Sequence, residues 1–587
     1  MAVVTVVGSA LFIYGYDRVV RELDDFAAMS VDELDKRSAR RNLWLANGKS
    51  ISGSPWVGRG VGSHREFYKI FMPNPFPLEY THAESGYWQV ASETGIAGFI
   101  LLAAGLGLVA SWSVSCMRNT TCRHTQAALG AVAAGLAASV VHAVWDFVWY
   151  IPATMSWTAL LAGMACRLQQ IPRARRASWG CDIRLARVGW VAITVLLAIV
   201  GAWMIRDRWS PALASRHWDN YLKKSQLSAE AGDRSAEDTL GDGTSEHAAA
   251  ETWTAQMRAD LETYLEYDRD YGRVHLRLAA TYLREFHDAQ RHATNPMDLS
   301  QIRDAAIASQ FPSRAALNQW LDRAIGQHRM LLDKALWHAR RALQLCPLQG
   351  EGYIYLAELC FLEGAPRSAT SAYVAQALKV RPHEGQVLFL AGKEALLKSD
   401  LKSAVGYWRQ SFHAGASHQR RLVRLLAGRL PVTFLLENIQ PGLDAWESLF
   451  AEYERLGQPQ PLRQLCDYYV ALAEKKREGL TGTRAVRLWL TMHRRYRELN
   501  EQEAAYACIE RAVASDPYNY LARLELAKAE LQRGNLRDAE TQFRWCLQQR
   551  PADRKAKSWL KKAVRLRVAT SHWPDDSASD SRISDRH

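Results

Sequence analysis

The chain has 587 residues, 48% of them hydrophobic, and a formal net charge of +13 at pH 7. This length exceeds what one hydrophobic core usually organises, so two or more domains are expected. The positive charge would suit nucleic acid or an anionic membrane surface. No run of Lys and Arg with interleaved aromatic residues indicates a nucleic-acid site, and many arginines lie beside apolar segments, so we expect contact with a membrane and none with nucleic acid.

Apolar segments close to the length of a membrane span dominate the first third of the chain. They are residues 2–16, 96–115, 126–145, 147–166 and 188–205. A helix needs ~20 apolar residues to cross the hydrocarbon of a bilayer. The first segment is short for a span, but it lacks the basic region and the small-residue cleavage site of a signal peptide. The pattern predicts a membrane domain over residues 1–205 with about five transmembrane helices.

Basic residues predict how these spans are oriented. Arg118 and Arg123 lie between the second and third spans, and five arginines lie between residues 173 and 187 against the single acid Asp182. By the positive-inside rule, both loops face the cytoplasm. The 17–95 loop and everything after residue 205 then lie on the outer face, which is the periplasm if the membrane is a bacterial inner membrane.

Repeated helical phrases fill residues 253–568. Pro517 and Pro551 are 34 residues apart and close the phrases AYACIERAVASDP and AETQFRWCLQQRP, and Pro347 and Pro382 are 35 apart and close a similar pair. Small residues where two helices cross, followed by a proline after the second helix, resemble the tetratricopeptide repeat. We therefore predict an all-α chain in which a soluble tetratricopeptide-like α-solenoid follows the membrane spans.

Helix pairs of this kind stack so that each covers the apolar face of the next. Such arrays usually bind a protein partner on the concave face; the alternative is an array that only spaces the membrane domain. Residues 206–252 are interpreted as a polar linker or helix, and residues 569–587 as a disordered tail. The nine cysteines include no CxxC pair, so neither a disulfide framework nor a metal site is expected.

The outer-face loop and the spans after it carry an ordered set of motifs. They are Arg41 with Trp44, then Pro55/Gly58/Gly60, Thr81-His82 with Tyr87, Glu93/Gly95/Gly98, His142, Asp146-Phe147 and Ile151-Pro152-Ala153. In this order they resemble the C-terminal part of the O-antigen ligase/polymerase family of polysaccharide membrane enzymes. The resemblance covers about residues 1–205, and relatives with tetratricopeptide repeats after the last span are known.

The resemblance implies transfer of a glycan from an undecaprenyl-diphosphate carrier to an acceptor hydroxyl, with no metal or other cofactor. Such chemistry needs cationic stabilisation of the departing diphosphate and a group that takes the acceptor's proton. Arg41, with Arg40 as its alternate, is the candidate for the first role. His82 is the candidate for the second, because its ordinary pKa of ~6.5 lies near working pH.

Each of these residues also has a structural interpretation. Arg41 could contact lipid phosphates, and His82 could bond a backbone carbonyl. Glu84 and Glu93 could cap helix starts, where negative charge is favourable. His142 and Asp146 are four residues apart and could pair with each other, either as a lock on the turn or as part of a site. Tyr87 is a supporting candidate only.

Family members have about ten or more spans and an additional arginine upstream. This sequence begins where the last third of such a domain would begin, so the resemblance implies that catalysis requires the missing spans from elsewhere. The alternative hypothesis is therefore a non-catalytic, membrane-anchored repeat scaffold for a cell-surface polysaccharide assembly complex.

Overall fold

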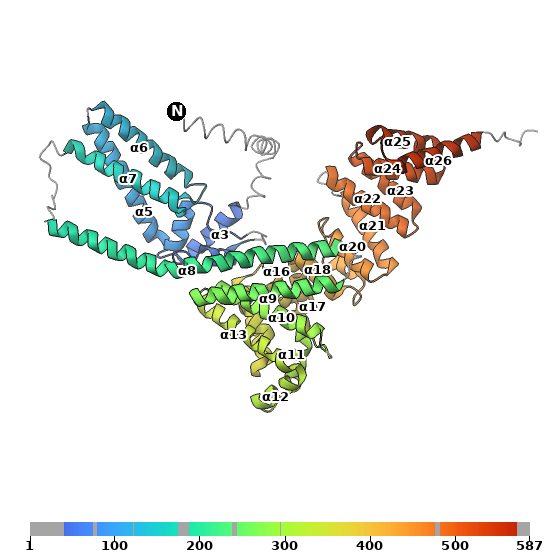
Figure 1. Cartoon of the computed structure of the whole chain (residues 1–587), viewed down its shortest axis with the longest axis horizontal. Helices are drawn as coiled ribbons and strands as arrows, with labels where there is room; N and C mark the ends of the chain where they lie inside the picture. Colours follow the sequence, from blue (N-terminus) through green and yellow to red (C-terminus); the bar gives the residue numbers. More distant parts are fainter. Residues whose placement is uncertain are drawn as a thin grey trace, which may run out of the picture. The chain divides into compact units, whose positions relative to one another are not determined.

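The computed structural model describes residues 40–73, 79–120, 122–173, 187–237, 243–293, 295–475 and 482–571. Over these ranges the chain is all-α, as expected: it contains no β-strand, and only one isolated bridge joins Ala427 and Leu430. The chain divides into two compact units, Met1–Ala414 and Gly415–His587 (Figure 1).

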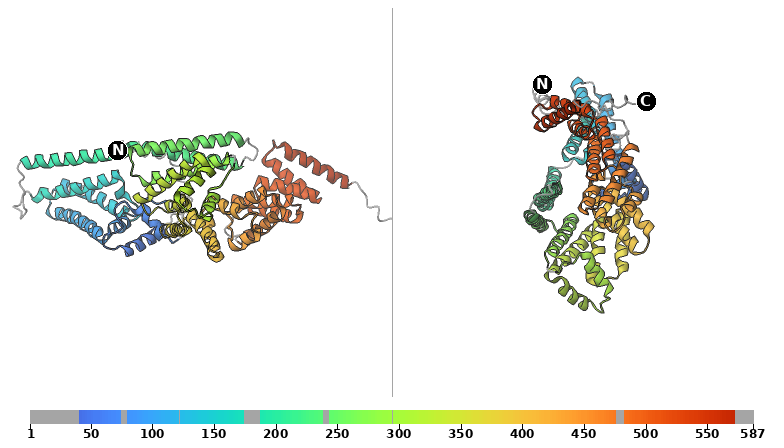
Figure 2. Two further views of the ribbon diagram at one scale, coloured as in Figure 1. Left: turned by 90° about the horizontal axis from the view of Figure 1, so that it is seen from below. Right: turned by 90° about the vertical axis from the view of Figure 1, so that its right-hand side faces the viewer.

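The first unit begins with the helices of the predicted membrane part. They are α3 (Arg40–Gly53), α4 (His64–Phe71), α5 (Gly86–Asn119), α6 (Arg123–His142), the 3₁₀ turn η1 (Val148–Tyr150), α7 (Pro152–Arg173) and α8 (Arg187–Glu237). Helices α5, α6 and α7 lie side by side (Figures 1 and 2). The short helices α3 and α4 belong to the loop that precedes α5.

Three helices among the described residues are long and apolar enough to cross a membrane: Gly86–Asn119, Arg123–His142 and the Gly189–Ser228 part of α8. The expectation of about five spans is met only in part. The first predicted span, residues 2–16, lies outside the described residues. The predicted span 147–166 is wrong at its start, because residues 147–151 form a turn and α7 begins only at Pro152. Proline suits a first helical position, where its missing N–H would have no partner.

Helix α8 shows where the membrane part meets the repeats. It is one helix of 51 residues, and it continues from the predicted span 188–205 through the segment expected to be a polar linker or helix. In that segment Ala214, Trp218 and Tyr221 pack into the core of the first repeats. Residues 206–228 are therefore part of the repeat packing, and no break in the helix marks residue 205.

The remaining helices of the first unit are α9 (Gly243–Tyr267), α10 (Gly272–Arg291), α11 (Leu299–Ala308), α12 (Arg314–Ile325), η2 (Gly326–His328), α13 (Arg329–Leu345), α14 (Gly350–Leu359), η3 (Cys360–Glu363), α15 (Arg367–Val380), α16 (Gly385–Leu397) and α17 (Leu401–His413). Helices α14 with α15 and α16 with α17 pack as consecutive pairs, whereas α10 packs on α13, with α11 and α12 between them in the chain.

The second unit contains α18 (Ala416–Leu426), α19 (Val432–Asn438), α20 (Trp446–Arg455), α21 (Pro459–Lys475), α22 (Gly482–Glu498), α23 (Gln502–Ser515), α24 (Tyr520–Arg533), α25 (Leu536–Gln549) and α26 (Arg554–Ser571). Helices α22 with α23 and α24 with α25 form its regular pairs. Residues 569–571, expected in the disordered tail, are the end of α26, and the rest of that predicted tail lies outside the described residues.

The repeat phrases correspond to these helix pairs. Pro347, Pro382, Pro517 and Pro551 each follow the second helix of a pair after a single intervening residue. Small residues lie at the crossings for a steric reason: a Cβ atom added at Gly392 of α16 would lie 2.3 Å from the Trp408 indole of α17. The chain therefore forms tetratricopeptide-like helix pairs.

Candidate functional site

The segment around His82 is fixed to two other parts of the predicted membrane domain. The Trp44 indole of α3 donates a hydrogen bond to the Ala83 carbonyl at 3.2 Å. The Gly86 N–H donates to the carbonyls of Ala143 at 2.8 Å and Asp146 at 3.0 Å, in the turn after α6. The sequence motifs at 41–44, 81–87 and 142–153 therefore meet in one place.

Charged side chains from all three motifs gather there. Arg40 Nη2 lies 3.7 Å from Glu84 Oε2, and His142 Nε2 lies 3.3 Å from Asp146 Oδ2. Burial raises the pKa of Glu84; Arg40 opposes that shift and the Asp146 carboxylate adds to it. Glu84 also adopts a φ of +53°, a backbone conformation that residues other than glycine rarely take. Such conformations are often found at functional sites.

His82 lies half-buried next to this charged group. Its ring stacks on Phe147, with centroids 4.5 Å apart and planes 6° apart, and tilts against Tyr150 at 5.5 Å. Nδ1 lies 2.9 Å from the Thr81 hydroxyl oxygen. Burial lowers the pKa of His82, so the imidazole is neutral at pH 7 and retains a lone pair that can accept a proton.

The two candidate arginines both lie exposed on the first turn of α3. Arg40, the alternate, makes the ion pair with Glu84. The geometry therefore places the Arg40 guanidinium beside the Glu84 carboxylate.

The glycine motifs form a backbone crossing. The Gly60 N–H donates to the Glu93 carbonyl at 2.9 Å, and the Ile96 N–H donates to the Pro55 carbonyl at 2.8 Å. A Cβ atom at Gly58 would lie 2.4 Å from the Glu93 carbonyl carbon, and one at Gly95 would lie 2.5 Å from the Trp56 carbonyl carbon. Only glycine permits this approach, so the two motifs pair with each other and have a structural role.

Tyr87 and Glu93, two of the supporting candidates, also stabilise this region. The Tyr87 hydroxyl donates to the Val140 carbonyl at 2.9 Å and its ring lies edge-on to Trp149. The Glu93 carboxylate is buried and accepts hydrogen bonds from the His64 N–H at 3.3 Å and the Gln89 side-chain amide at 2.8 Å. These contacts give both residues a structural role in holding the elements around His82 together.

An apolar pocket of about 410 Å³ adjoins the charged group. It lies between α3 and the start of α5, and it shares Ser85, Tyr87 and Val144 with the walls of the site. The other lining residues are apolar or aromatic apart from a glycine and are Trp44, Ile51, Trp88, Ala91, Gly95, Ile96 and Phe99. Such a pocket can take a hydrocarbon chain whose polar end lies near Arg40 and His82.

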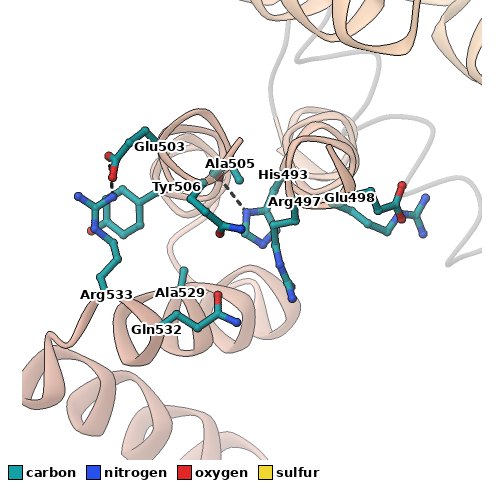
Figure 3. A pocket seen from close by; sticks show the side chains of 11 residues that line it. His493, Arg497, Glu498, Glu503, Ala505, Tyr506, Ala529, Gln532 and Arg533 are labelled. Carbon is teal, nitrogen blue, oxygen red and sulfur yellow. Dashed lines mark hydrogen bonds and ion pairs between the residues drawn. The ribbon is translucent and has the colours of Figure 1, made fainter. Parts of the chain in front are cut away.

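The second unit has a polar groove between α22, α23 and α24 with a volume of about 510 Å³ (Figure 3). His493 is 3% exposed and its Nδ1 lies 2.8 Å from the Ala505 carbonyl, as the dashed line in Figure 3 shows. Nδ1 must therefore carry the proton, which leaves Nε2 as an acceptor. Nε2 has no hydrogen-bond partner among the described residues.

Arginines surround this histidine. Arg494, Arg497 and Arg533 line the groove together with Glu498 and Glu503. The Arg533 guanidinium pairs with Glu503 at 2.8 Å and lies 4.1 Å from the centre of the Tyr506 ring (Figure 3). Arg497 Nη1 also lies 3.4 Å from Glu525 Oε2. The groove therefore presents guanidinium groups that are partly paired with carboxylates, whereas His493 Nε2 is itself buried.

No protein-family profile matches this chain, and no curated protein matches it. Among solved structures it is similar to the APC/C hetero-tetramer Cut9-Hcn1, with 13% identity over 81% of this chain and 75% of that one and a TM-score of 0.21. It is also similar to Pseudomonas aeruginosa pilF, with 14% identity over 45% of this chain and 99% of that one and a TM-score of 0.19. A tetratricopeptide repeat protein from Parabacteroides merdae is 11% identical over 59% of this chain and 99% of that one, with a TM-score of 0.18. The fold assignment rests on the helix pairs themselves.

One residue of the site was not foreseen from the sequence. His64, the first residue of α4, is fully buried, and its ring stacks on Tyr68 at 5.2 Å. Burial, with a smaller contribution from the nearby His82, lowers its pKa to about 4. The local sequence does not distinguish His64, because its burial depends on tertiary packing as well as on its neighbours Phe67 and Tyr68. Over the described ranges, no group of three or more His, Cys, Asp or Glu side chains could hold a metal ion.

Proposed function

We propose that this protein is a membrane-anchored repeat scaffold that holds a protein partner through an acidic segment. The groove around His493 is the observation that carries the proposal. The arginines that line it call for carboxylates. A peptide segment with acidic side chains supplies them.

The membrane anchor is supported by the uncovered apolar surface of the candidate spans. In α8, Leu196, Ile199 and Trp203 are each at least 60% exposed. A surface of this kind is unfavourable in water and is satisfied by lipid. The resemblance of the first 205 residues to the O-antigen ligase/polymerase family suggests assembly of cell-surface polysaccharide at a bacterial inner membrane as the setting.

A binding assay on the full chain tests the scaffold. The probe is an array of synthetic peptides with acidic, basic or uncharged side chains. Acidic peptides should bind, more weakly at high salt because screening reduces charge attraction. Arg497→Gln should weaken binding about tenfold, whereas Arg550→Gln, an exposed arginine outside the groove, should not. Equal binding of acidic and basic peptides would refute the proposal.

Glycan transfer is the second candidate function, and one observation favours it: the charged group and His82 adjoin the apolar pocket beside α5. In this proposal the pocket takes the isoprenoid chain of an undecaprenyl-diphosphate carrier, and Arg40 or Arg41 stabilises the departing diphosphate. Neutral His82 takes the proton of the acceptor hydroxyl. His142 and Asp146 hold the turn against which His82 stacks.

An assay of glycan transfer from a polyprenyl-diphosphate-linked glycan distinguishes the transferase from the non-catalytic scaffold. If the chain is a transferase, His82→Ala should lower the rate by roughly 10²–10⁴-fold at unchanged protein level. Tyr468→Phe, far along the chain, serves as the control. Transfer that survives His82→Ala at the normal rate would exclude the catalytic role, and no transfer at all by the intact chain would leave the scaffold.

A further inference from the structure

The outer-face loop and the repeats are joined by a buried ion pair between distant parts of the first unit. Arg273 Nε, at the start of α10, donates to Glu66 Oε1 of α4 at 3.1 Å. Arg381, in the turn after α15, donates to the Glu66 carbonyl at 3.0 Å and to Oε2 at 3.3 Å. The carboxylate therefore lies between two guanidinium groups that come from different repeats. The Arg381 side chain is only 6% exposed.

The same arginine reaches the segment that leads to His82. Arg273 also donates to both Glu79 oxygens, at 3.1 and 3.3 Å, and Glu79 is paired with Arg65 and Lys69 of the loop. Burial alone would raise the pKa of Glu79, but hydrogen bonds from Arg65 and Arg273 lower it well below its usual range. Glu79 is three residues before His82, so Arg273 fixes both α4 and the start of the His82 segment.

Apolar contacts accompany these charges. Phe67, Tyr68 and Met72 are buried together, and Leu348, from the turn between α13 and α14, packs against them. The contacts on the repeat side come from the start of α10 and from two successive turns between helix pairs. Helix α4 therefore docks on an edge of the repeat stack formed by helix starts and turns.

We infer that Arg273 and Arg381 bind the Glu66 carboxylate and thereby hold the repeats on the same membrane face as the outer-face loop. This makes both arginines positioning residues for the His82 segment. The inference is independent of partner binding and of glycan transfer. A paired arginine that is buried as well as Arg381, in a low-dielectric contact, specifies one docked arrangement.

The docking also requires an even number of membrane crossings between Glu79 and Arg273. Five α-helices, α5 to α9, separate the two residues, and three of them qualify as spans by length and apolar character. Three crossings would place Glu66 and Arg273 on opposite faces, ~30 Å of hydrocarbon apart. Contact at 3.1 Å requires an even number, and α7 crossing together with the three qualifying helices gives four. The 22 residues of α7 extend roughly 33 Å.

Site-resolved cysteine labelling of the full chain in sealed membrane vesicles tests this topology. An impermeant maleimide is applied to a chain with Lys49→Cys in α3 and Lys398→Cys in the repeats, both exposed positions, and labelled peptides are identified by mass spectrometry. Native Cys122, in the loop between α5 and α6, is the opposite-face reporter. We expect the two introduced cysteines to react together and Cys122 only after permeabilisation, or the reverse in inverted vesicles. Labelling of Lys49→Cys and Lys398→Cys from opposite faces overturns the inference.

Hydrogen exchange tests the positioning role. Glu66→Gln keeps the side-chain shape but removes the charge, so amide protection in residues 79–85 should fall about tenfold or more. Glu285→Gln is the matched control: its side chain is equally exposed at 19% and pairs with Arg258 inside the repeats. Unchanged protection in residues 79–85 for Glu66→Gln and for Arg273→Ala, with the repeats folded, would refute the positioning role.

Discussion

The crossing of two backbones at Gly58 and Gly95 leads to a quantitative prediction. In Gly95→Ala the new Cβ would lie 2.5 Å from the carbonyl carbon and oxygen of Trp56 and 2.6 Å from the Gly58 nitrogen. These are backbone atoms, so no side chain can rotate away. The φ of +67° adds a conformational cost of about 1–2 kcal/mol for any residue with a Cβ, and overpacking adds about 1–3 kcal/mol. We expect destabilisation by about 2–5 kcal/mol.

Gly105→Ala is the matched control, because Gly105 lies in the same helix α5 and nothing would lie within 4 Å of its Cβ. Alanine at a helical position should be neutral or stabilising by up to about 1 kcal/mol. Thermal unfolding of the full chain in detergent, followed by tryptophan fluorescence, measures both variants. Gly95→Ala should melt several degrees lower, at about 2–4 °C per kcal/mol. Equal melting temperatures for the two variants would refute the close-approach argument.

Three further predictions concern the repeats, a loop cysteine and the docked helix. Gly392→Ala should destabilise the first unit by about 1–3 kcal/mol in denaturant unfolding, because its Cβ would lie 2.3 Å from the Trp408 indole; an unchanged midpoint would contradict the packing. Hydrogen bonds from Thr125 and His124 lower the pKa of exposed Cys122 to about 7. The rate of its alkylation should therefore rise steeply over roughly one pH unit on either side of that pKa. Cys346, whose pKa is raised by burial, should react slowly at every pH in this range. The pKa of Glu79 is lower in the folded chain than its ordinary value of about 4.3, so its ion pairs stabilise the docked α4 fully above that pH. This stabilisation is lost as the pH falls further, and hydrogen exchange in residues 64–72 should accelerate between about pH 4 and 2 in the native chain but not in Glu79→Gln.

Much of the architecture follows from local patterns. Helical periodicity and the prolines at 347, 382, 517 and 551 predicted the helix pairs, because a proline after one intervening residue ends each second helix. Long apolar runs predicted α5, α6 and the first part of α8. The start of α7 was misplaced because apolar side chains at 147–151 suit a packed turn as well as a span.

The candidate site was predictable as a set of motifs but not as a geometry. The sequence indicated Arg40, His82 and Glu84, and the structure brings them together with His142 and Asp146 around one turn. It could not indicate that Arg40 pairs with Glu84, because Glu84 lies outside helix α3 and a helical pattern does not identify a partner in another segment.

The sequence alone determined the helical character of the chain, its repeat period and the positions of its most apolar helices. Each depends on residues within one or two helical turns, where composition and spacing are sufficient. Only the tertiary structure decided which residues meet: the Gly58–Gly95 crossing, the burial of His64, the lone acceptor of His493 and the docking of Glu66 on Arg273, 207 residues away. Such contacts depend on how distant elements pack, and a local pattern carries no information about a partner that far along the chain.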